Sequence, residues 1–246
     1  MGTECRNSLS HRREHNIVCG RINLWMSSVE LAEVFELFRE PEWLPRYNLC
    51  PMQQILTVRM HPKGVRLAEE VQWGLVPSWT KSPVTGPPLN NARCETITSK
   101  PSFSDSFRKR RCLIPANGFY EWKRLDHKTK QPWNIFRADG QPLAMAGIWD
   151  HWQAPDGDTL ESCAVITTEA NEFMANIHDR MPVILAKSDW DHWLNSDVTD
   201  PDSLTQLLVP CPNEWLAGNP VSSLVNSVNH DSVECIHPVK ENRTLF

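Results

Sequence analysis

The chain has 246 residues and a formal net charge of −5, and 40% of its residues are apolar. The apolar content excludes a disordered protein, and the net charge argues against a histone-like protein covered in positive charge, although a local basic groove stays compatible with it. No apolar run reaches the roughly 18 residues of a membrane-spanning helix, and the start of the chain lacks the apolar centre of a secretory signal. We therefore expect one large domain in the reducing cytosol, without membrane association.

Residues 17–24 form an apolar run that predicts the first strand. Ser27 and Glu30 then have the spacing of a capping box, in which each side chain bonds the backbone N–H of the other residue. The box predicts a helix that ends near Glu40 and Pro41, since proline interrupts helical hydrogen bonding. Its apolar face is expected to hold Leu31, Val34, Phe35 and Phe38.

From Gln54 onward, short apolar runs alternate with turn signals, which is typical of antiparallel hairpins. The turns fall at residues 62–64, 126–132, 139–140 and 155–158. Three short helices are expected at residues 171–177, 188–194 and 201–208. Ser188 is predicted to open the second and Pro201 the third. This order, without a repeat or a regular strand–helix rhythm, favours a single β-rich α+β domain.

The eight cysteines are widely spaced, and no two have the close spacing of a zinc knuckle or a redox motif. Free thiols are therefore expected, with no bound metal and no cofactor. The positions are Cys5, Cys19, Cys50, Cys94, Cys112, Cys163, Cys211 and Cys235.

Glu121 is the only charged residue within the apolar run CLIPANGFYEW. Strand alternation places Glu121 on the same face as Phe119 and opposite Tyr120. Burial on that face would raise the pKa of the carboxyl group toward the range useful for proton transfer. The alternative is an edge-strand glutamate paired with a nearby lysine such as Lys123.

His178 opens the polar triplet HDR in front of an apolar segment, and Pro182 disfavours a helix there. Histidine suits proton transfer near neutral pH, but a single loop histidine also serves structural roles. Asn91 and Arg93 in LNNARCET allow two interpretations as well: contact with a substrate or phosphate, or a simple asparagine turn.

The densest positive run is RKRR at residues 108–111, and Trp73 and Trp79 flank the segment GLVPS. Basic residues beside exposed rings suit single-stranded nucleic acid, because phosphates supply affinity and rings stack on bases. The alternative is a solvated basic turn together with two tryptophans of the core.

Nine ordered segments carry a more specific signal than any single residue. They are CGRINLW, RYNLCPMQQ, WGLVPSW, NARCET followed by KPSF, RCLIPANGFYEWK, ADGQPLAMAGIW, VITTEAN, IHDRMPVIL and PVSSLVNSV. In this order they resemble the SOS response-associated peptidase (SRAP) family, from Cys19 to about Val239. The resemblance implies one SRAP domain at residues 19–246, with antiparallel strands in a barrel-like core and several short helices.

By this resemblance, the domain binds single-stranded DNA and captures abasic sites through an amino-terminal cysteine, here Cys19. The family's Asn, Glu and His fall on Asn91, Glu121 and His178. The α-amine would form a Schiff base with the ring-opened aldehyde, and the thiol would then close a thiazolidine ring. We expect Glu121 to shuttle protons, His178 to protonate or hydrogen-bond the departing sugar hydroxyl, and Asn91 to hold the amine.

The resemblance also implies a local positive groove for DNA, which is compatible with the negative net charge because salt screens charges beyond about 10 Å. The expected DNA-binding residues are Arg21, Arg93 and Arg180 at phosphates, Pro51 and Trp73 along the DNA path, and Asn48 and Lys100 as further members.

The sequence departs from the family pattern at its start, because residues 1–18 make the nitrogen of Cys19 an amide that cannot form a Schiff base. We expect this leader to be absent from the mature protein. It would be removed by processing, or Val18 would be a bacterial GTG start codon whose methionine is removed. Cys50 and Cys94 also occupy positions of expected small residues, and the segment NHDS lacks an expected glycine.

Three functions compete at this point. The first is an abasic-site crosslinking enzyme with lyase-like Schiff-base chemistry, acting in DNA repair during the SOS or replication-associated damage response. The second is a cysteine peptidase, acting on its own leader or on other chains, with the Cys19 thiolate activated by His178. The third is a non-covalent binder of single-stranded or modified DNA. We expect a cytoplasmic, nucleoid-associated monomer whose partner is single-stranded DNA containing abasic sites.

Overall fold

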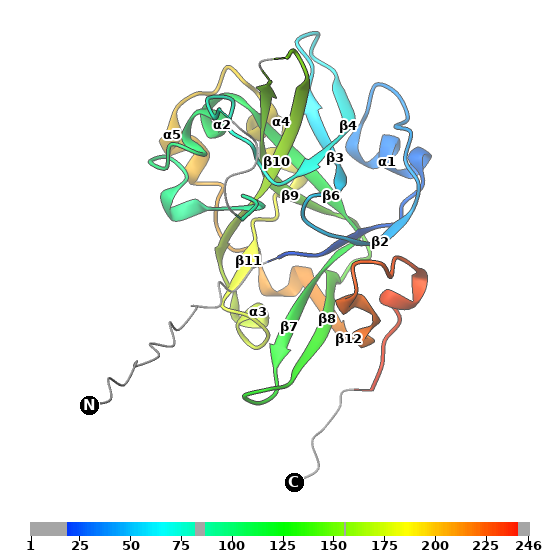
Figure 1. The fold of residues 1–246 in the computed structure, drawn as a ribbon. Helices are drawn as coiled ribbons and strands as arrows, with labels where there is room; N and C mark the ends of the chain where they lie inside the picture. The colour runs from blue at the N-terminus through cyan, green and yellow to red at the C-terminus, as the bar shows by residue number, and fades with distance from the viewer. Residues whose placement is uncertain (1–18, 82–86, 155, 241–246) are drawn as a thin grey trace, which may run out of the picture.

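The computed structural model describes residues 19–81, 87–154 and 156–240 (Figure 1). The predicted leader lies outside the described residues. The strands are β1 (Ile22–Leu24), β2 (Arg46–Leu49), β3 (Gln54–Met60), β4 (Arg66–Trp73), β5 (Asn91–Arg93), β6 (Arg111–Ala116), β7 (Gly118–Arg124), β8 (Lys130–Arg137), β9 (Leu143–Gln153), β10 (Thr159–Glu169), β11 (Arg180–Pro182) and β12 (Leu216–Pro220). The α-helices are α1 (Ser28–Phe35), α2 (Ser104–Lys109), α3 (Glu172–Ala175), α4 (Trp190–Leu194) and α5 (Pro201–Thr205).

Five strands close into a barrel. β3 pairs with β4 and β6, β6 pairs with β9, β9 pairs with β10, and a short parallel pairing of β10 with β4 completes the ring. β5 and β11 add to β10 outside this ring. Buried apolar side chains from these strands form the main core. The predicted β-rich α+β domain with a barrel-like core is confirmed.

The second sheet has the strand order β12-β8-β7-β1-β2 and is antiparallel throughout. Only Asn117 separates β6 of the barrel from β7 of this sheet. The β7–β8 hairpin extends away from the barrel in Figure 1. This sheet therefore begins directly at the barrel wall and places β1 beside β7.

Three of the predicted hairpin turns are confirmed. Residues 62–64 join β3 to β4, and residues 125–129 join β7 to β8. Residues 156–158 precede β10, which pairs antiparallel with β9 from Thr159 to Val165. Residues 139–140 form a turn between β8 and β9, but these strands belong to different sheets, so the predicted hairpin there is wrong.

Helix α1 begins as predicted. The Ser27 hydroxyl accepts a hydrogen bond from the Glu30 backbone N–H at 3.3 Å, and the Glu30 carboxylate accepts one from the Ser27 backbone N–H at 2.8 Å. Leu31 and Phe35 are buried on its inner face. The capping box is therefore formed, and it satisfies donors at the helix start.

Helix α1 ends at Phe35, earlier than the predicted end near Glu40 and Pro41. Glu36 adopts a left-handed conformation with φ of 53°, which terminates the helix. Beyond it, the Phe38 backbone N–H donates to the carbonyl of Arg66 at 2.9 Å. Pairing with β4 thus replaces the last helical turns, and Phe38 is exposed instead of lying on a buried face.

The other short helices differ from the predictions mainly at their ends. Asn171 caps α3 through its side chain. Helix α4 begins at Trp190, and Ser188 lies in a preceding 3₁₀ turn, so it does not cap the helix as predicted. Asp200 caps α5, which ends at Thr205. All three helices were correctly predicted to exist.

The described cysteines carry no disulfide, which confirms the expected free thiols for this part of the chain. They are Cys19, Cys50, Cys94, Cys112, Cys163, Cys211 and Cys235. Cys5 lies outside the described residues.

Candidate functional site

Cys19 lies directly beside Glu121. β1 and β7 pair with Ile22 opposite Phe119, and the Tyr120 backbone N–H donates to the carbonyl of Arg21 at 2.9 Å. Continuing this antiparallel arrangement brings the backbone nitrogen of Cys19 to 2.5 Å from Oε1 of Glu121. Both residues are buried. Two positions 102 residues apart in the sequence are thus joined by one short hydrogen bond.

Glu121 is an interior carboxyl group and not an edge-strand ion pair. Burial raises its pKa to about 8, against the opposing effect of hydrogen bonds from the backbone N–H groups of Cys19 and Trp122. Phe119, on the same face, belongs to the main core, whereas Tyr120 packs in a separate small cluster. The predicted alternation is confirmed. A pKa near the operating pH allows this carboxyl group to accept and to donate a proton.

The Cys19 thiol is also buried. Burial, with a smaller contribution from the neighbouring Glu121, raises the pKa of this thiol well above its ordinary value. The thiol form is therefore favoured over the thiolate near neutral pH.

His178 lies in the loop between α3 and β11, and its side chain is largely buried. Its Nδ1 accepts the backbone N–H of Arg180 at 3.1 Å and lies 2.9 Å from Oδ1 of Asp179. Burial lowers the pKa of the imidazole, against the attraction of Asp179. The Arg180 contact suits a ring with its proton on Nε2, whereas the Asp179 contact suits a ring protonated on Nδ1.

Charges link the His178 loop to Glu121. Asp179 raises the pKa of Glu121, and Lys130 acts on both Glu121 and His178. These effects require the two groups to share one neighbourhood, because Coulomb interactions weaken with distance. The structure thus brings Cys19, Glu121 and the His178 loop together.

Asn91 and Arg93 lie on β5, which runs parallel to β10 with Asn91 opposite Val165. β11, which begins with Arg180, pairs with β10 on its other side. Asn91 is therefore connected to the His178 loop through β10. Asn91 is half-buried and Arg93 is exposed.

The guanidinium of Arg180 does not point freely to solvent. Its Nη1 and Nη2 contact both carboxylate oxygens of Glu95, and Nη2 also donates to the Thr167 carbonyl at 2.8 Å. Sequence reasoning did not single out Glu95, although it lies within the NARCET motif. Its acidic side chain, two positions after Arg93, was the available signal.

The half-buried Arg21 and the buried Asn48 form a hydrogen-bonded pair that contacts the C-terminal segment. Arg21 donates to the Asn48 side chain at 2.8 Å and to the carbonyls of Val225 and Asn226 at 2.5 and 3.1 Å. Asn48 is fully buried and donates to the carbonyl of His230 at 2.6 Å. Through these hydrogen bonds Asn48 holds the Arg21 side chain and the C-terminal loop.

Asp231 anchors the segment NHDS to β2. Its carboxylate accepts the backbone N–H groups of Tyr47 and Asn48 at 2.5 and 2.9 Å and forms an ion pair with Arg46. These bonds attach the C-terminal loop to β2.

The two tryptophans differ in exposure. Trp73 is fully buried and donates to the carbonyl of Asn90 at 2.9 Å. Trp79 is 64% exposed and donates to the carbonyl of Pro101. The exposed Lys100 lies next to Pro101 in the chain. The interpretation of two core tryptophans is correct for Trp73 and wrong for Trp79.

The basic run at residues 108–111 is chiefly structural. Arg111 is buried, and its guanidinium donates to the carbonyls of Trp193, Phe107, Arg108, Asn195 and Val198. Lys109 and Arg110 form ion pairs with Asp105. This run is therefore neither a free basic patch nor an entirely solvated turn.

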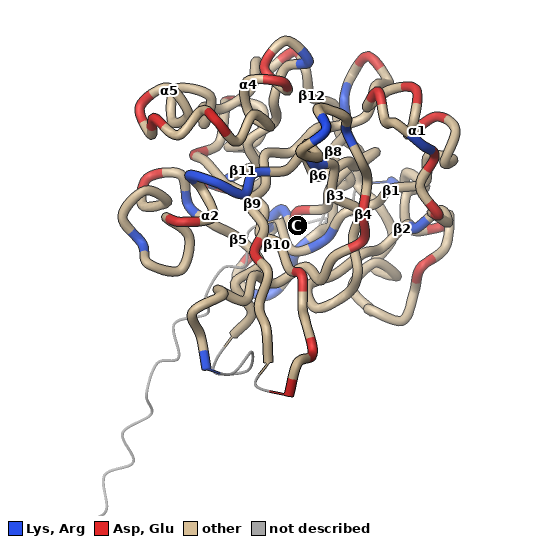
Figure 2. The backbone as a smooth tube through the Cα atoms, turned by 90° about the horizontal axis from the view of Figure 1, so that it is seen from above, with Lys and Arg blue, Asp and Glu red and all other residues tan. Residues whose placement is uncertain are grey.

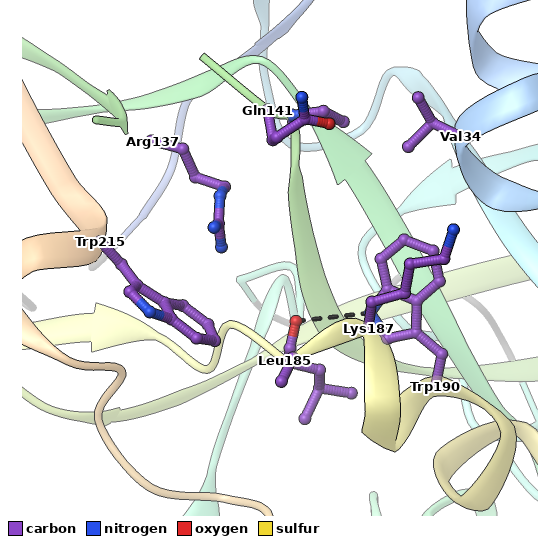
Figure 3. Close-up of a pocket in the computed structure, with 9 residues that line it drawn as sticks. Val34, Arg137, Gln141, Leu185, Lys187, Trp190 and Trp215 are labelled. Atoms are coloured by element: carbon purple, nitrogen blue, oxygen red, sulfur yellow. Dashed lines mark hydrogen bonds between the residues drawn. The ribbon is translucent and has the colours of Figure 1, made fainter. Parts of the chain in front are cut away.

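A pocket of about 260 Å³ lies elsewhere on the molecule, lined in part by Arg137, Lys187, Trp190 and Trp215 (Figure 3). It includes no predicted site residue. Arg137 pairs with Asp139 at 2.5 Å, and Lys187 pairs with Glu36 at 2.8 Å. The cations of this pocket are thus already neutralised by acidic neighbours.

Within the described ranges, no group of three or more metal-binding side chains occurs. No helix in that part of the chain is long and apolar enough to cross a membrane.

Acidic residues are conspicuous along β4 and around α1 in Figure 2.

A family model described as SOS response associated peptidase (SRAP) matches residues 18–228. The chain belongs to this family. This SRAP chain is 43% identical over 222 residues to the abasic site processing protein YoqW of Bacillus subtilis, with 89% of the chain and 99% of YoqW covered.

Two further relatives are more distant. The abasic site processing protein YedK of Escherichia coli is 32% identical over 201 residues, which cover 81% of the chain and 87% of YedK. The abasic site processing protein HMCES of Gallus gallus is 32% identical over 239 residues, with 82% and 70% covered.

Solved structures share the fold. A protein from Bacteroides thetaiotaomicron matches with a TM-score of 0.78 at 23% identity, covering 90% of this chain and 100% of that chain. A protein from Bordetella bronchiseptica matches with a TM-score of 0.73 at 24% identity, covering 83% of this chain and 100% of that chain. At these identities the likeness concerns the fold alone.

Proposed function

We propose that this chain acts in DNA repair by crosslinking itself to abasic sites in single-stranded DNA through Cys19. The observation that carries the proposal is the buried Glu121 carboxyl group 2.5 Å from the backbone nitrogen of Cys19, with a pKa of about 8. Relatives named abasic site processing proteins, at 32% to 43% identity, support it.

The proposed working form begins at Cys19, without residues 1–18. The family match begins at residue 18, directly before Cys19. In this form the nitrogen beside Glu121 is an α-amine, whose reference pKa of about 7.7 to 8.0 leaves a substantial neutral fraction at physiological pH. A neutral amine can attack an aldehyde, which an amide cannot do.

The reaction needs two bond-forming steps and no redox change. The amine nitrogen bonds to the aldehyde carbon, and the two amine protons leave with the carbonyl oxygen as water, giving the imine. The Cys19 sulfur then bonds to the imine carbon while its proton moves to nitrogen, which closes the thiazolidine. Glu121 can accept the proton from the attacking amine and return it to the departing oxygen, because burial raises the pKa of this carboxyl group while a nearby ammonium favours its ionised form.

His178 and Asn91 have proposed supporting roles in this sequence. The His178 ring accepts at Nδ1 from Arg180, so Nε2–H is available to hydrogen-bond the departing sugar hydroxyl. Asn91 on β5 would hold the amine in place.

The proposed DNA path follows the exposed members of the site. Arg93 and Lys100 are exposed cations, Trp79 is an exposed ring, and Pro51 is half-buried at the start of the turn before β3. Cations hold phosphates and rings stack on bases without sequence preference. We assign the aromatic contact to Trp79.

The peptidase alternative is less well supported by this geometry. A cysteine peptidase needs a thiolate, and burial raises the pKa of the Cys19 thiol. The amine chemistry needs only the thiol form for the second step, after the imine has formed.

The test uses protein that begins at Cys19 and single-stranded DNA with one abasic site. A denaturing gel and intact mass are expected to show a conjugate equal to protein plus DNA minus one water. Cys19→Ser keeps the amine and lacks the thiol, so it should give a conjugate only after borohydride reduction of the imine.

The full-length chain is the second control, because its Cys19 nitrogen is an amide and should give no conjugate. Peptide products in place of a conjugate would favour the peptidase. Retained DNA binding without any conjugate would favour a non-covalent binder, and either result would refute the proposal.

A further inference from the structure

We propose that Glu95 is a positioning residue for the crosslinking reaction, acting through Arg180 to hold the Asn91 strand and the His178 loop at a fixed separation. This inference rests on the proposed function and assigns a role to a residue outside the predicted site. Its basis is an ion pair that joins two segments which share no direct strand pairing among the described residues.

The first step is topological. β5 and β11 are each three residues long, and both depend on β10 for their backbone pairing. Thr167 of β10 lies opposite Arg93 on one side and Pro182 on the other. Two strands this short contribute few ladder bonds of their own, so side-chain contacts matter for their placement.

The second step is the contact that crosses β10. Glu95 lies two residues after the end of β5 in the 3₁₀ turn Cys94–Thr96, Arg180 begins β11, and the carboxylate meets the guanidinium through both oxygens. Arg180 also donates to the Thr167 carbonyl and lies 3.3 Å from the Thr167 hydroxyl. Two-point contacts between arginine and carboxylate fix direction as well as distance. The Arg180 side chain is 13% exposed and the Glu95 side chain is 50% exposed, so the guanidinium side of the pair is the side shielded from solvent.

The third step connects this pair to the reacting groups. The backbone N–H of Arg180 donates to Nδ1 of His178, so the position of Arg180 sets the ring's tautomer and direction. On the other side, β5 carries Asn91 four residues before Glu95. The link therefore runs along the backbone from Asn91 to Glu95, and then through the side chain and backbone of Arg180 to His178.

Glu95 also reduces the positive charge that Arg180 presents to DNA. Arg93 keeps its exposed position on the same strand. Removing the Glu95 charge is therefore expected to strengthen DNA binding while slowing the reaction. A change that merely unfolds the protein would lower both the DNA affinity and the crosslinking rate. A higher affinity together with a lower rate therefore identifies a positioning role.

The experiment compares Glu95→Gln with wild type, both beginning at Cys19. Affinity is measured on single-stranded DNA without a lesion, and the single-turnover crosslinking rate is measured at saturating abasic DNA. We expect affinity to rise severalfold, the salt slope to steepen by up to about 1, and the rate to fall on the order of tenfold. Glu70→Gln on β4 is the matched control, since Glu70 is an exposed acid away from the site.

Two further variants protect the test against misfolding of Glu95→Gln. Arg180→Lys keeps the charge but loses the two-point contact, so its crosslinking rate at saturating abasic DNA should fall. The double variant Glu95→Gln with Arg180→Gln should react no more slowly than Arg180→Gln alone. The single variant has already lost the Glu95–Arg180 ion pair, so the second change removes nothing further from it.

The possible failures are distinct. Equal rates for wild type and Glu95→Gln, or a parallel loss of affinity and rate in soluble, cooperatively folded protein, would overturn the inference alone. Absence of a conjugate with wild type would refute the proposed function itself, and the inference with it.

Discussion

Glu121→Gln should change the pH dependence of stability in the full-length chain. Glutamine keeps the size of the side chain and an oxygen that can accept from the Cys19 N–H, but it does not ionise. In wild type, burial raises the pKa of Glu121 from an ordinary value of 4.5 to about 8. The variant therefore removes one buried ionisation and leaves the packing largely intact.

The sign follows from where each state ionises. Below pH 4.5 the carboxyl group is protonated in both folded and unfolded protein, and the difference between variant and wild type is constant. Between pH 4.5 and about 8 only the unfolded state ionises, so wild type loses stability relative to the variant as pH rises. At 1.36 kcal/mol per pH unit, the full relative loss is about 5 kcal/mol, complete above the folded pKa.

Urea unfolding of both proteins across this pH range measures the effect, with Glu70→Gln as an exposed control. A second comparison uses protein beginning at Cys19. Its ammonium group beside Glu121 favours the carboxylate, so the pH-dependent difference should shrink. A difference between wild type and Glu121→Gln that stays flat from acid to alkaline pH would refute the buried, protonated carboxyl group.

Three further predictions concern single residues. Arg111→Gln should lower the free energy of unfolding by roughly 3 to 5 kcal/mol, because buried carbonyls lose a charged donor; a urea melt with a change below 1 kcal/mol would contradict this. Gly118→Ala should cost about 2 kcal/mol or more, since the new Cβ would lie 2.6 Å from Oδ1 of Asn134 and 2.8 Å from the Ile135 carbonyl oxygen; an unchanged thermal midpoint would show that β7 and β8 can separate freely. Trp79→Ala should weaken binding of unmodified single-stranded DNA by about 1 to 3 kcal/mol without loss of stability, measured by fluorescence anisotropy; unchanged affinity would remove Trp79 from the DNA path.

Local sequence patterns predicted several features correctly because they report backbone periodicity and hydrogen bonding. The capping box at Ser27 and Glu30 formed as expected. The alternation around Glu121 placed Phe119 and Tyr120 in different clusters. The end of α1 was wrong, since pairing of Phe38 with β4 is a contact that helix propensity does not contain.

Side-chain environments were less accessible from the sequence. Trp73 and Trp79 share a residue type and a short segment, yet one is fully buried and the other is 64% exposed. Arg111 belongs to the most basic run and lies inside the protein against backbone carbonyls. The exposure of a side chain depends on which segments, distant in the sequence, pack over it in the fold. The residues adjacent to it in the sequence do not determine this packing.

The sequence alone determined the family, the barrel-containing fold class and the presence of Cys19, Asn91, Glu121 and His178. Those conclusions rest on ordered motifs and on local periodicity. The tertiary structure decided that Glu121 is buried against the Cys19 nitrogen, and that Glu95 holds Arg180 across β10. The physical reason is that desolvation and short contacts set the pKa and direction of a side chain, and both arise only when residues far apart in the sequence come together in the fold.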